Sequence, residues 1–348
     1  MQRRNFIFSM GAAALAMQFP GQTKLFAQNK FNGKLKPRAL KPGDTIGIIA
    51  PGSAVNSPDD YLLAEELADY LGLKVRYASN VKKGSGYKTR TIAERVDDIH
   101  EVFSDKSLAG VFCLRGGYGS GQLLDYIAYG IIKKNPKVFL GYSDITALHL
   151  AINKFTGLVT FHGPVMLSSF TELTAESLKK AIFSNKPIGI IENPTDQNPV
   201  RVKHPVRTIN PGKAKGELIG GNLSLITSLM GTKYEINTSR RILFIEDVGE
   251  PPYRIDRMLT QLKTAGKFKK VAGVVFGKCE DCTPGLSAST WDLSLGEVLD
   301  NIFADINIPV FYGLTFGHTK DQFTLPLSVN AEMDADLHTL NITENACV

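Results

Sequence analysis

A serine at the junction of two predicted elements is the first candidate for chemistry. Ser143 follows an apolar run at 138–140 and a glycine, and it precedes a helix-like segment, in the sequence FLGYSDITAL at 139–148. A serine at such a strand-to-helix turn exposes its hydroxyl above the sheet edge, beside the amides of the helix N-terminus, which is how a nucleophilic serine is mounted. No glycine occupies position 145, so the G-x-S-x-G pattern is incomplete. Ser143 could equally be the N-cap of the helix, and its role depends on finding partners.

A nucleophilic serine needs a general base, which is most often a histidine. His318, in FGHT at 316–319, follows an apolar strand-like run and precedes a polar loop, so its side chain is free to project. His162, in FHGP at 161–164, could instead be a buried, hydrogen-bonded structural group. The other histidines lie within predicted helices, in a connecting segment or in a terminal strand: His100, His149, His204 and His338.

The acid that orients the imidazole is expected at a strand end, where a carboxylate is fixed and partly buried. Glu246 ends an apolar run in LFIED at 243–247, and Glu250 follows in GEPP at 249–252. Glu246 is the better candidate because it directly ends the strand. Both side chains could instead be charges that favour the N-terminus of a helix beginning near Tyr253.

Backbone N–H groups usually hold the oxyanion in acyl transfer. The amide of Asp144, directly after Ser143, would supply one donor. Gly117, in RGGYGS at 115–120, would supply the other, because glycine lets the backbone approach a substrate closely. A phosphate cradle is the alternative, but the segment has neither the G-K-[ST] of a P-loop nor a good G-x-G-x-x-G fingerprint.

The elements that would position these residues alternate between strand and helix. Short apolar runs and amphipathic patterns follow one another from residue 45 to about 161, which predicts an α/β fold with a mostly parallel sheet, of the flavodoxin or glutamine-amidotransferase type. Ser53, Gly117, Ser143 and His162 each follow a predicted strand. They are therefore expected at the edge of the sheet where ligands bind.

The chain of 348 residues is long enough for two cores. We predict an N-terminal α/β domain at 36–166, a connection at 167–212 that is rich in Asn-Pro and His-Pro steps, and a β-rich α+β domain at 213–345. The last segment, from 327 to 342, alternates like a hairpin.

Residues 1–27 are predicted to be an export signal and not part of the fold. A basic start precedes an apolar stretch at 6–19, which is too short for a membrane span, and RRNFI at 3–7 resembles a twin-arginine signal. We expect an exported, periplasmic protein without stable membrane insertion after cleavage, and an uncleaved amphipathic anchor is the alternative. Arg3, Arg4 and Lys24 lie in this stretch, and they supply half of the net charge of +6. The remaining charge is too small to indicate nucleic-acid binding.

Cys279 and Cys282 form the one C-x-x-C pair of the sequence. A structural zinc site needs two further ligands at suitable spacing, and none is evident nearby. We therefore predict no metal site. The alternatives left are a loop pair that oxidises after export and two unrelated thiols.

Six motifs taken in order resemble one family, the LD-carboxypeptidases, which are serine peptidases and include the microcin C self-immunity proteins. The resemblance extends over roughly residues 40–335, and the motifs that carry it are RGGYGS, LGYSDIT, FHGP, GELIGGNLS, ILFIEDVGEPPYRIDRMLTQL and FGHT.

The resemblance implies a catalytic triad of Ser143, Glu246 and His318, with oxyanion amides from Gly117 and Asp144. The nucleophile would come from the first domain and the acid and base from the second, so that the site lies between them. The resemblance also implies a homodimer that needs no metal or cofactor.

The substrate implied by the resemblance is a murein tetrapeptide of the bacterial cell wall. The bond cut joins the L-centre of diaminopimelate or lysine to a terminal D-alanine, whose carboxylate calls for a nearby cation. Arg115 is the candidate cation, and a structural salt bridge is the alternative role for it. Two further functions stay open. One is a microcin C-type self-immunity peptidase, for which the single Trp291 could stack on a nucleotide. The other is a non-catalytic binder of cell-wall peptides, whose triad atoms would lie out of hydrogen-bond reach.

Overall fold

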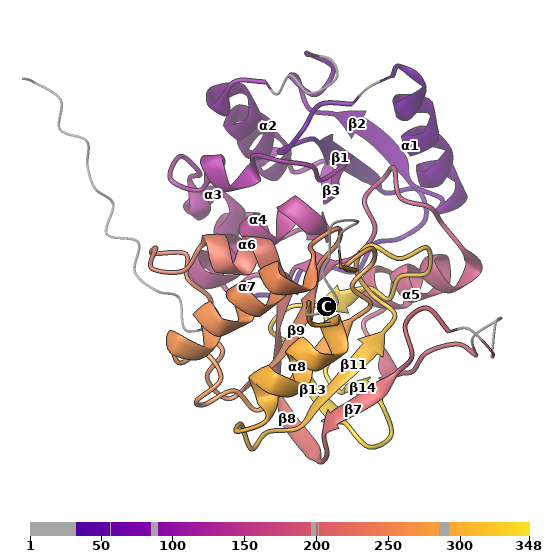
Figure 1. Ribbon diagram of the computed structural model, residues 1–348. Coiled ribbons are helices and arrows are strands. Elements are labelled where there is room, and N and C mark those ends of the chain that lie inside the picture. The colour runs from indigo at the N-terminus through magenta and orange to yellow at the C-terminus, as the bar shows by residue number, and fades with distance from the viewer. Residues whose placement is uncertain (1–32, 56, 85–89, 196–199, 201, 285–291) are drawn as a thin grey trace, which may run out of the picture.

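The computed structural model describes residues 33–55, 57–84, 90–195, 200, 202–284 and 292–348 (Figure 1). These residues form two sheets with helices packed around them. The predicted export signal and Trp291 lie outside the described residues. None of the helices in the described ranges combines the length and the apolar character that crossing a membrane requires.

The first sheet has six strands in the order β12-β5-β4-β3-β1-β2. Its strands from β2 to β5 are parallel, and β12 pairs with β5 antiparallel. Five of the six residues of β3 are buried, as expected for a parallel strand covered by helices. The strands are β1 (Thr45–Ile49), β2 (Lys74–Tyr77), β3 (Leu108–Cys113), β4 (Val138–Gly141), β5 (Phe161–His162) and β12 (Leu325–Pro326).

Among the helices of this half, α2 follows its predicted amphipathic pattern, whereas α1 buries Ala64, Leu67 and Ala68 and leaves Leu62 and Leu63 exposed. In α2, Thr91 and Glu94 form a capping box, and the apolar face that includes Val96, Ile99 and Val102 is buried. The capping box satisfies the free amides of the first turn, while the apolar face supplies the packing energy. The helices are α1 (Asp59–Tyr70), α2 (Ile92–Ser104), α3 (Tyr129–Lys134) and α4 (Thr146–Thr156), with the 3₁₀ turns η1 (Ser120–Leu123) and η2 (Ser143–Ile145).

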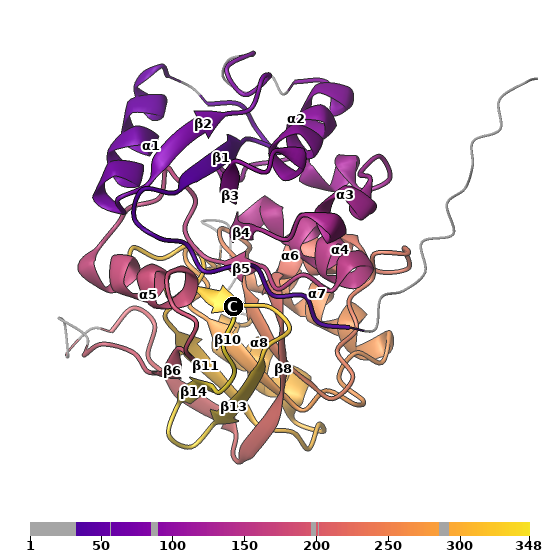
Figure 2. The same ribbon diagram turned by 180° about the vertical axis from the view of Figure 1, so that it is seen from behind.

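The second sheet has eight strands in the order β6-β14-β13-β8-β9-β10-β11-β7. Its centre, β8 to β11, is parallel, and the strands on both sides of the centre are antiparallel. The helices α7 and α8 lie in front of this sheet in Figure 1, whereas the view from behind shows β8 and β13 in front (Figure 2). The elements are β6 (Gly189–Ile191), β7 (Arg207–Asn210), β8 (Lys213–Asn222), α6 (Leu223–Ser228), β9 (Arg241–Glu246), α7 (Pro252–Thr264), β10 (Gly273–Gly277), α8 (Leu295–Phe303), β11 (Val310–Leu314), β13 (Asn330–Asp334) and β14 (Thr339–Ile342).

The two sheets exchange elements, so the division along the chain is less simple than predicted. The predicted connection at 167–212 contains α5 (Glu172–Ile182) and the edge strands β6 and β7 of the second sheet. In return, β12 lies within the predicted second domain but pairs with β5 of the first sheet. Short edge strands of two to four residues carry too little periodicity to be recognised locally, because their pairing is decided by distant segments.

Candidate active site

Ser143 follows β4 and occupies a backbone conformation that few non-glycine residues adopt. Its φ is 63°, in the left-handed region. The N-cap of the 3₁₀ turn η2 is Tyr142, and the N-cap of α4 is Ile145. Neither of these residues makes a side-chain cap hydrogen bond. The alternative that Ser143 merely caps the helix is therefore wrong, and its hydroxyl is free to contact another group.

That other group is His318, in the loop after β11. The Nε2 atom of His318 lies 2.9 Å from Ser143 Oγ, and its Nδ1 atom lies 2.7 Å from Glu246 Oε2. Glu246 is the last residue of β9 and is fully buried. Tyr142 packs against the imidazole, with ring centroids 4.8 Å apart. The structure thus places a hydroxyl, an imidazole and a carboxylate in the order and at the distances of an activated nucleophile.

The electrostatics of this group favour a proton on the imidazole. Burial by itself lowers the pKa of His318, but the Glu246 carboxylate more than offsets this, and the pKa lies above its usual value. Burial likewise raises the pKa of Glu246, and the paired His318 reverses the shift, so that the net pKa is lowered. The pair can therefore hold a proton taken from Ser143 as an imidazolium–carboxylate pair.

The glycine-rich turn after β3 lies directly beside Ser143. A Cβ atom at Gly116 would stand 3.1 Å from Ser143 Cβ, and one at Gly117 would stand 2.4 Å from Ser53 Oγ. Gly117 also has a φ of 96°, which strains any other residue. Gly117 therefore requires glycine and Gly116 has little room for a side chain, and the exposed backbone of Gly117 lines the same cavity as Ser143.

Two side chains that hold this turn were not recognised in the sequence. The carboxylate of Asp144 accepts hydrogen bonds from the amides of Gly119 at 3.2 Å and Ser120 at 2.9 Å. Ser53, which follows β1, accepts one from the Tyr118 amide at 3.2 Å. Asp144 had been singled out for its backbone amide alone, and Ser53 only for its position at the sheet edge. The only local sign of these supporting contacts in the sequence was the acidic residue, Asp144, directly after Ser143.

The segments that carry Ser143 and Glu246 are linked across the two sheets by a second set of polar contacts. Thr146 lies three residues after Ser143, and its Oγ1 accepts a hydrogen bond of 3.0 Å from the backbone N–H of Asn222. The side chain of Asn222 donates to Asp247 Oδ1 at 3.0 Å, next to Glu246. Gly221 has no room for a Cβ atom, which would stand 2.6 Å from Thr146 Oγ1. This contact fixes the distance between α4 and the end of β9.

A cavity of about 420 Å³ opens above Ser143 and His318. Arg115 lines it, and its Nη1 donates to the carbonyl of Ala54 at 3.2 Å. Arg115 is half-buried. The hydrogen bond to Ala54 holds its guanidinium in place, while part of the side chain stays accessible from the cavity. Asp60, from the first turn of α1, lines the same cavity.

The remaining candidates take no part in the hydrogen bonds that join Ser143, His318 and Glu246. His162 is buried at the end of β5, and burial lowers its pKa to about 4. The alternative of a buried, hydrogen-bonded structural group is right about the burial of His162 but wrong about its hydrogen bonds, because neither ring nitrogen has a hydrogen-bond partner among the described residues. Glu250 pairs with Arg254, with Oε2 and Nη1 3.4 Å apart, and neither it nor Glu246 lies in the first turn of α7. Cys279 and Cys282 are free, buried thiols, and within the described ranges no cluster of His, Cys, Asp or Glu side chains could hold a metal ion.

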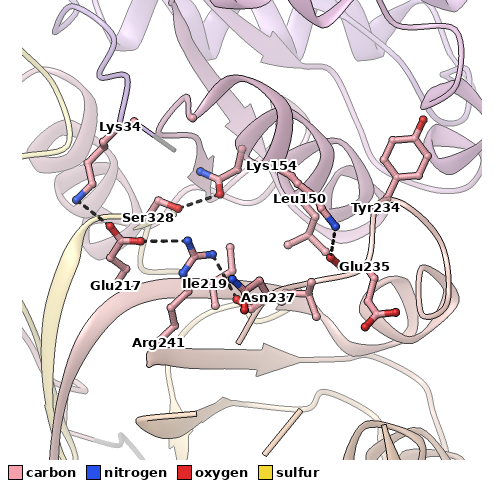
Figure 3. Close-up of a pocket in the computed structure, with 14 residues that line it drawn as sticks. Lys34, Leu150, Lys154, Glu217, Ile219, Tyr234, Glu235, Asn237, Arg241 and Ser328 are labelled. Atoms are coloured by element: carbon pink, nitrogen blue, oxygen red, sulfur yellow. Dashed lines mark hydrogen bonds and ion pairs between the residues drawn. The ribbon is translucent and has the colours of Figure 1, made fainter. Parts of the chain in front are cut away.

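A second cavity, of about 290 Å³, lies at the opposite end of α4 and β9 (Figure 3). Glu217 stands between Lys34 and Arg241 in this cavity, with ion pairs of 3.4 and 3.2 Å. Lys154, near the end of α4, donates to the carbonyl of Glu235 at 2.9 Å. The Lys154 contact ties α4 to the segment that precedes β9, at the end that is remote from Ser143.

Comparison with known proteins agrees with this architecture. Models of the LD-carboxypeptidase N-terminal and C-terminal domains match residues 46–163 and 215–333. A probable murein peptide carboxypeptidase of Bacillus subtilis is 40% identical over 306 residues, which cover 87% of this chain and 93% of that protein. The microcin C7 self-immunity protein MccF of Escherichia coli is 32% identical over 332 residues, covering 88% of this chain and 94% of that one.

Solved structures give the same result. The structure of MccF in complex with glutamyl sulfamoyl guanosine superposes with a TM-score of 0.79 at 28% identity, covering 90% of this chain and all of that one. A muramoyltetrapeptide carboxypeptidase from Oxalobacter formigenes superposes with a TM-score of 0.72 at 29% identity, covering 86% and 99%. The two domain models together span more than half of the residues. The N-terminal model covers strands β1 to β5 of the first sheet, and the C-terminal model covers the centre of the second sheet. This chain belongs to the LD-carboxypeptidase family and is a carboxypeptidase.

Proposed function

We propose that this carboxypeptidase is of the serine type and removes the terminal D-alanine from murein tetrapeptides by cutting an L,D peptide bond. The observation that supports it is the continuous contact from Ser143 through His318 to Glu246, at 2.9 and 2.7 Å. A fully buried carboxylate that orients an imidazole toward a serine hydroxyl is suited to acyl transfer.

The mechanism follows from the positions of these groups. His318 Nε2 accepts the proton of Ser143 as Oγ attacks the carbonyl carbon of the L-residue. The amides of Gly117 and Asp144 stabilise the resulting oxyanion. His318 then gives its proton to the departing amine, and the C–N bond breaks to leave an acyl-enzyme. A water molecule, deprotonated by His318, attacks the ester and regenerates Ser143.

The substrate class is inferred from relatives and from the charge of the cavity. Relatives are named murein peptide carboxypeptidase and murein tetrapeptide carboxypeptidase. The departing residue carries a free carboxylate, and Arg115 lines the cavity beside Ser143. We assign Arg115 to that carboxylate.

We also propose the cellular setting and the assembly. A basic start, an apolar stretch and the twin-arginine-like RRNFI motif indicate export to the periplasm. There the enzyme would trim peptides of the cell wall. The family resemblance supports a homodimer.

A second candidate is cleavage of an acyl-nucleotide conjugate, because MccF is among the relatives of this chain. An exported enzyme would not meet a toxin in the cytoplasm, which favours the murein substrate. A non-catalytic peptide binder is disfavoured, because it predicts Ser143 and His318 out of hydrogen-bond reach, whereas Ser143 Oγ and His318 Nε2 lie 2.9 Å apart.

The test is to incubate the mature protein with a murein tetrapeptide and, separately, with an aminoacyl sulfamoyl nucleotide, and to weigh the products. Loss of one alanine from the tetrapeptide supports the proposal. Cleavage of the nucleotide conjugate alone would favour the second candidate, and cleavage of neither would contradict both.

A further inference from the structure

Several buried polar atoms near Glu246 have no hydrogen-bond partner among the described residues. They are both ring nitrogens of His162, Nδ1 of His149 and Oε1 of Glu246, the carboxylate oxygen that His318 does not contact. The two histidines are each 1% exposed and Glu246 is not exposed at all. Buried polar atoms of native proteins nearly always bond to the protein or to ordered water. A cluster of such atoms beside the acid of the proposed triad therefore needs an explanation.

His162 neighbours both of the other groups. Its ring centroid lies 6.4 Å from that of His149 in α4 and 5.3 Å from that of Phe244 in β9. Phe244 and Glu246 are two residues apart in β9, so their side chains leave the strand on the same face. The Glu246 carboxylate is also close enough to oppose the lowering of the His162 pKa by burial.

The protonation of these side chains follows from their contacts and burial. His149 Nε2 lies 2.8 Å from the carbonyl oxygen of Gly141, and a carbonyl only accepts, so Nε2 carries a proton. Burial lowers the pKa of His149 to about 3, so its ring is neutral and Nδ1 is an acceptor. Burial lowers the pKa of His162 to about 4, which leaves this ring with one N–H donor and one acceptor.

The cluster therefore has more acceptors than donors. Glu246 Oε1, His149 Nδ1 and one nitrogen of His162 accept, whereas the one donor is the other nitrogen of His162. The hydrogen bond of the Asn222 side chain, which also lies near Glu246, goes to Asp247 Oδ1 at 3.0 Å. If the His162 N–H serves His149, two acceptors are left, and one water molecule supplies two O–H donors.

We propose that one buried water molecule donates hydrogen bonds to Glu246 Oε1 and to a ring nitrogen of His162, and that His162 thereby acts as a positioning residue for the acid of the triad. Glu246 would then be held on one side by His318 and on the other by the water. The water site stands on the polar atoms alone, whereas the role of His162 in turnover rests on the proposed function.

The water site is tested first, on the unmodified protein. A high-resolution crystal structure should show an ordered water within about 3.2 Å of both Glu246 Oε1 and a ring nitrogen of His162. Nitrogen NMR at neutral pH should give the shifts of a neutral His162 ring. A direct bond between His162 and Glu246, a site without water, or a charged His162 ring would each overturn the proposal, since a charged ring supplies both donors by itself.

The positioning role is tested with two variants in a murein tetrapeptide assay. His162→Leu removes the polar contact, and kcat should fall by about ten- to a hundredfold, the range for a hydrogen bond to a charged group, with KM within about twofold. His162→Gln keeps a donor and an acceptor, and kcat should stay within a few fold. Melting curves of both variants separate this loss from unfolding.

The pH profile gives a result that a merely structural role would not produce. In His162→Leu the Glu246 carboxylate loses a donor and holds the proton of His318 more strongly, so the acid limb of kcat/KM should move to higher pH. It should stay in place in His162→Gln. The other ionisable groups that act on this pair are unchanged in both variants, namely Asp247 beside Glu246 and Tyr142 against His318.

Equal losses in the two variants, or a limb that does not move in His162→Leu, would mean that only the shape of the side chain matters and would overturn the positioning role. If His162→Leu does not fold, unchanged kcat and acid limb in His162→Gln together with the water in the crystal uphold it, and a loss in His162→Gln overturns it. If the unmodified enzyme cleaves no peptide, the proposed function fails, while the crystal structure still decides the water site.

Discussion

Replacing Glu246 with glutamine tests the proposed site most directly, because it removes a charge while keeping the size of the side chain. Glu246 is fully buried, and its Oε2 lies 2.7 Å from His318 Nδ1. In the variant, the amide can present an N–H where the imidazole also needs to donate, which favours the wrong tautomer. The imidazolium that forms during attack by Ser143 would then have no buried counter-charge.

The size of the loss follows from burial. Removing one partner of a buried ion pair costs about 3–5 kcal/mol, because the other charge is left without water or a partner. Glu246 is inaccessible to solvent, so no water can take over its role. At about 1.4 kcal/mol for each factor of ten, this corresponds to a loss of about 10²- to 10⁴-fold in kcat/KM.

The assay measures release of alanine from a murein tetrapeptide by Glu246→Gln and by a control, Glu250→Gln. Glu250 forms an ion pair with Arg254, four residues later, at 3.4 Å, and such pairs contribute a few tenths of a kcal/mol. The control is expected to keep activity within about twofold. A Glu246→Gln variant that retains more than about a tenth of the activity, or a larger loss in Glu250→Gln, would refute the assignment of the acid.

Three further outcomes are expected. Ser143→Ala should reduce alanine release by several orders of magnitude, with an unchanged melting temperature, and near-normal turnover would exclude it as nucleophile. Gly117→Ala should lower both activity and thermal stability, because its Cβ atom would stand 2.4 Å from Ser53 Oγ at a φ of 96°, whereas Gly121→Ala, with no atom within 4 Å of a new Cβ, is the tolerated control. In a pH profile, kcat/KM should fall as the pH drops through the pKa of His318, because the protonated imidazole cannot accept a proton. Since Glu246 raises that pKa, the acid limb should lie above the usual histidine value of about 6.5, and a limb below that value would contradict the pairing.

The parallel architecture of the first half was predictable because its central strands are apolar runs that alternate with longer helical segments. β1, β3 and β4 are continuous apolar runs, and α2 carries both a capping box and an apolar face. The exchange of elements between the sheets was not predictable. β12 has two residues, and its partner β5 lies more than 150 residues earlier in the chain, so that no local pattern indicates the pairing.

The candidate site was predictable in part, for a related reason. Ser143, Glu246 and His318 each follow or end a recognisable strand, and strand ends are where a sheet presents functional side chains. The supporting contacts of Ser53 and Asp144 depend on which turns lie side by side, and spacing along the sequence does not contain that information. The strained φ of Ser143 could not be predicted either, because a serine carries no glycine-like signal for the left-handed region.

The proposed triad is divided between the two halves of the molecule, so its geometry depends on how firmly the two sheets are held against each other. Ser143 lies in the turn η2 just before α4, whereas Glu246 ends β9 and His318 lies in the loop after β11 of the second sheet, so a small rotation between the two halves would break the hydrogen bond between Ser143 and His318. The structure resists such a rotation at both ends of α4. Close to Ser143, Asn222 joins Thr146 to Asp247 through two hydrogen bonds of 3.0 Å, and at the far end Lys154 of α4 donates to the carbonyl of Glu235, in the segment before β9 (Figure 3). The geometry of the proposed triad is therefore a property of the interface between the sheets as much as of its three side chains.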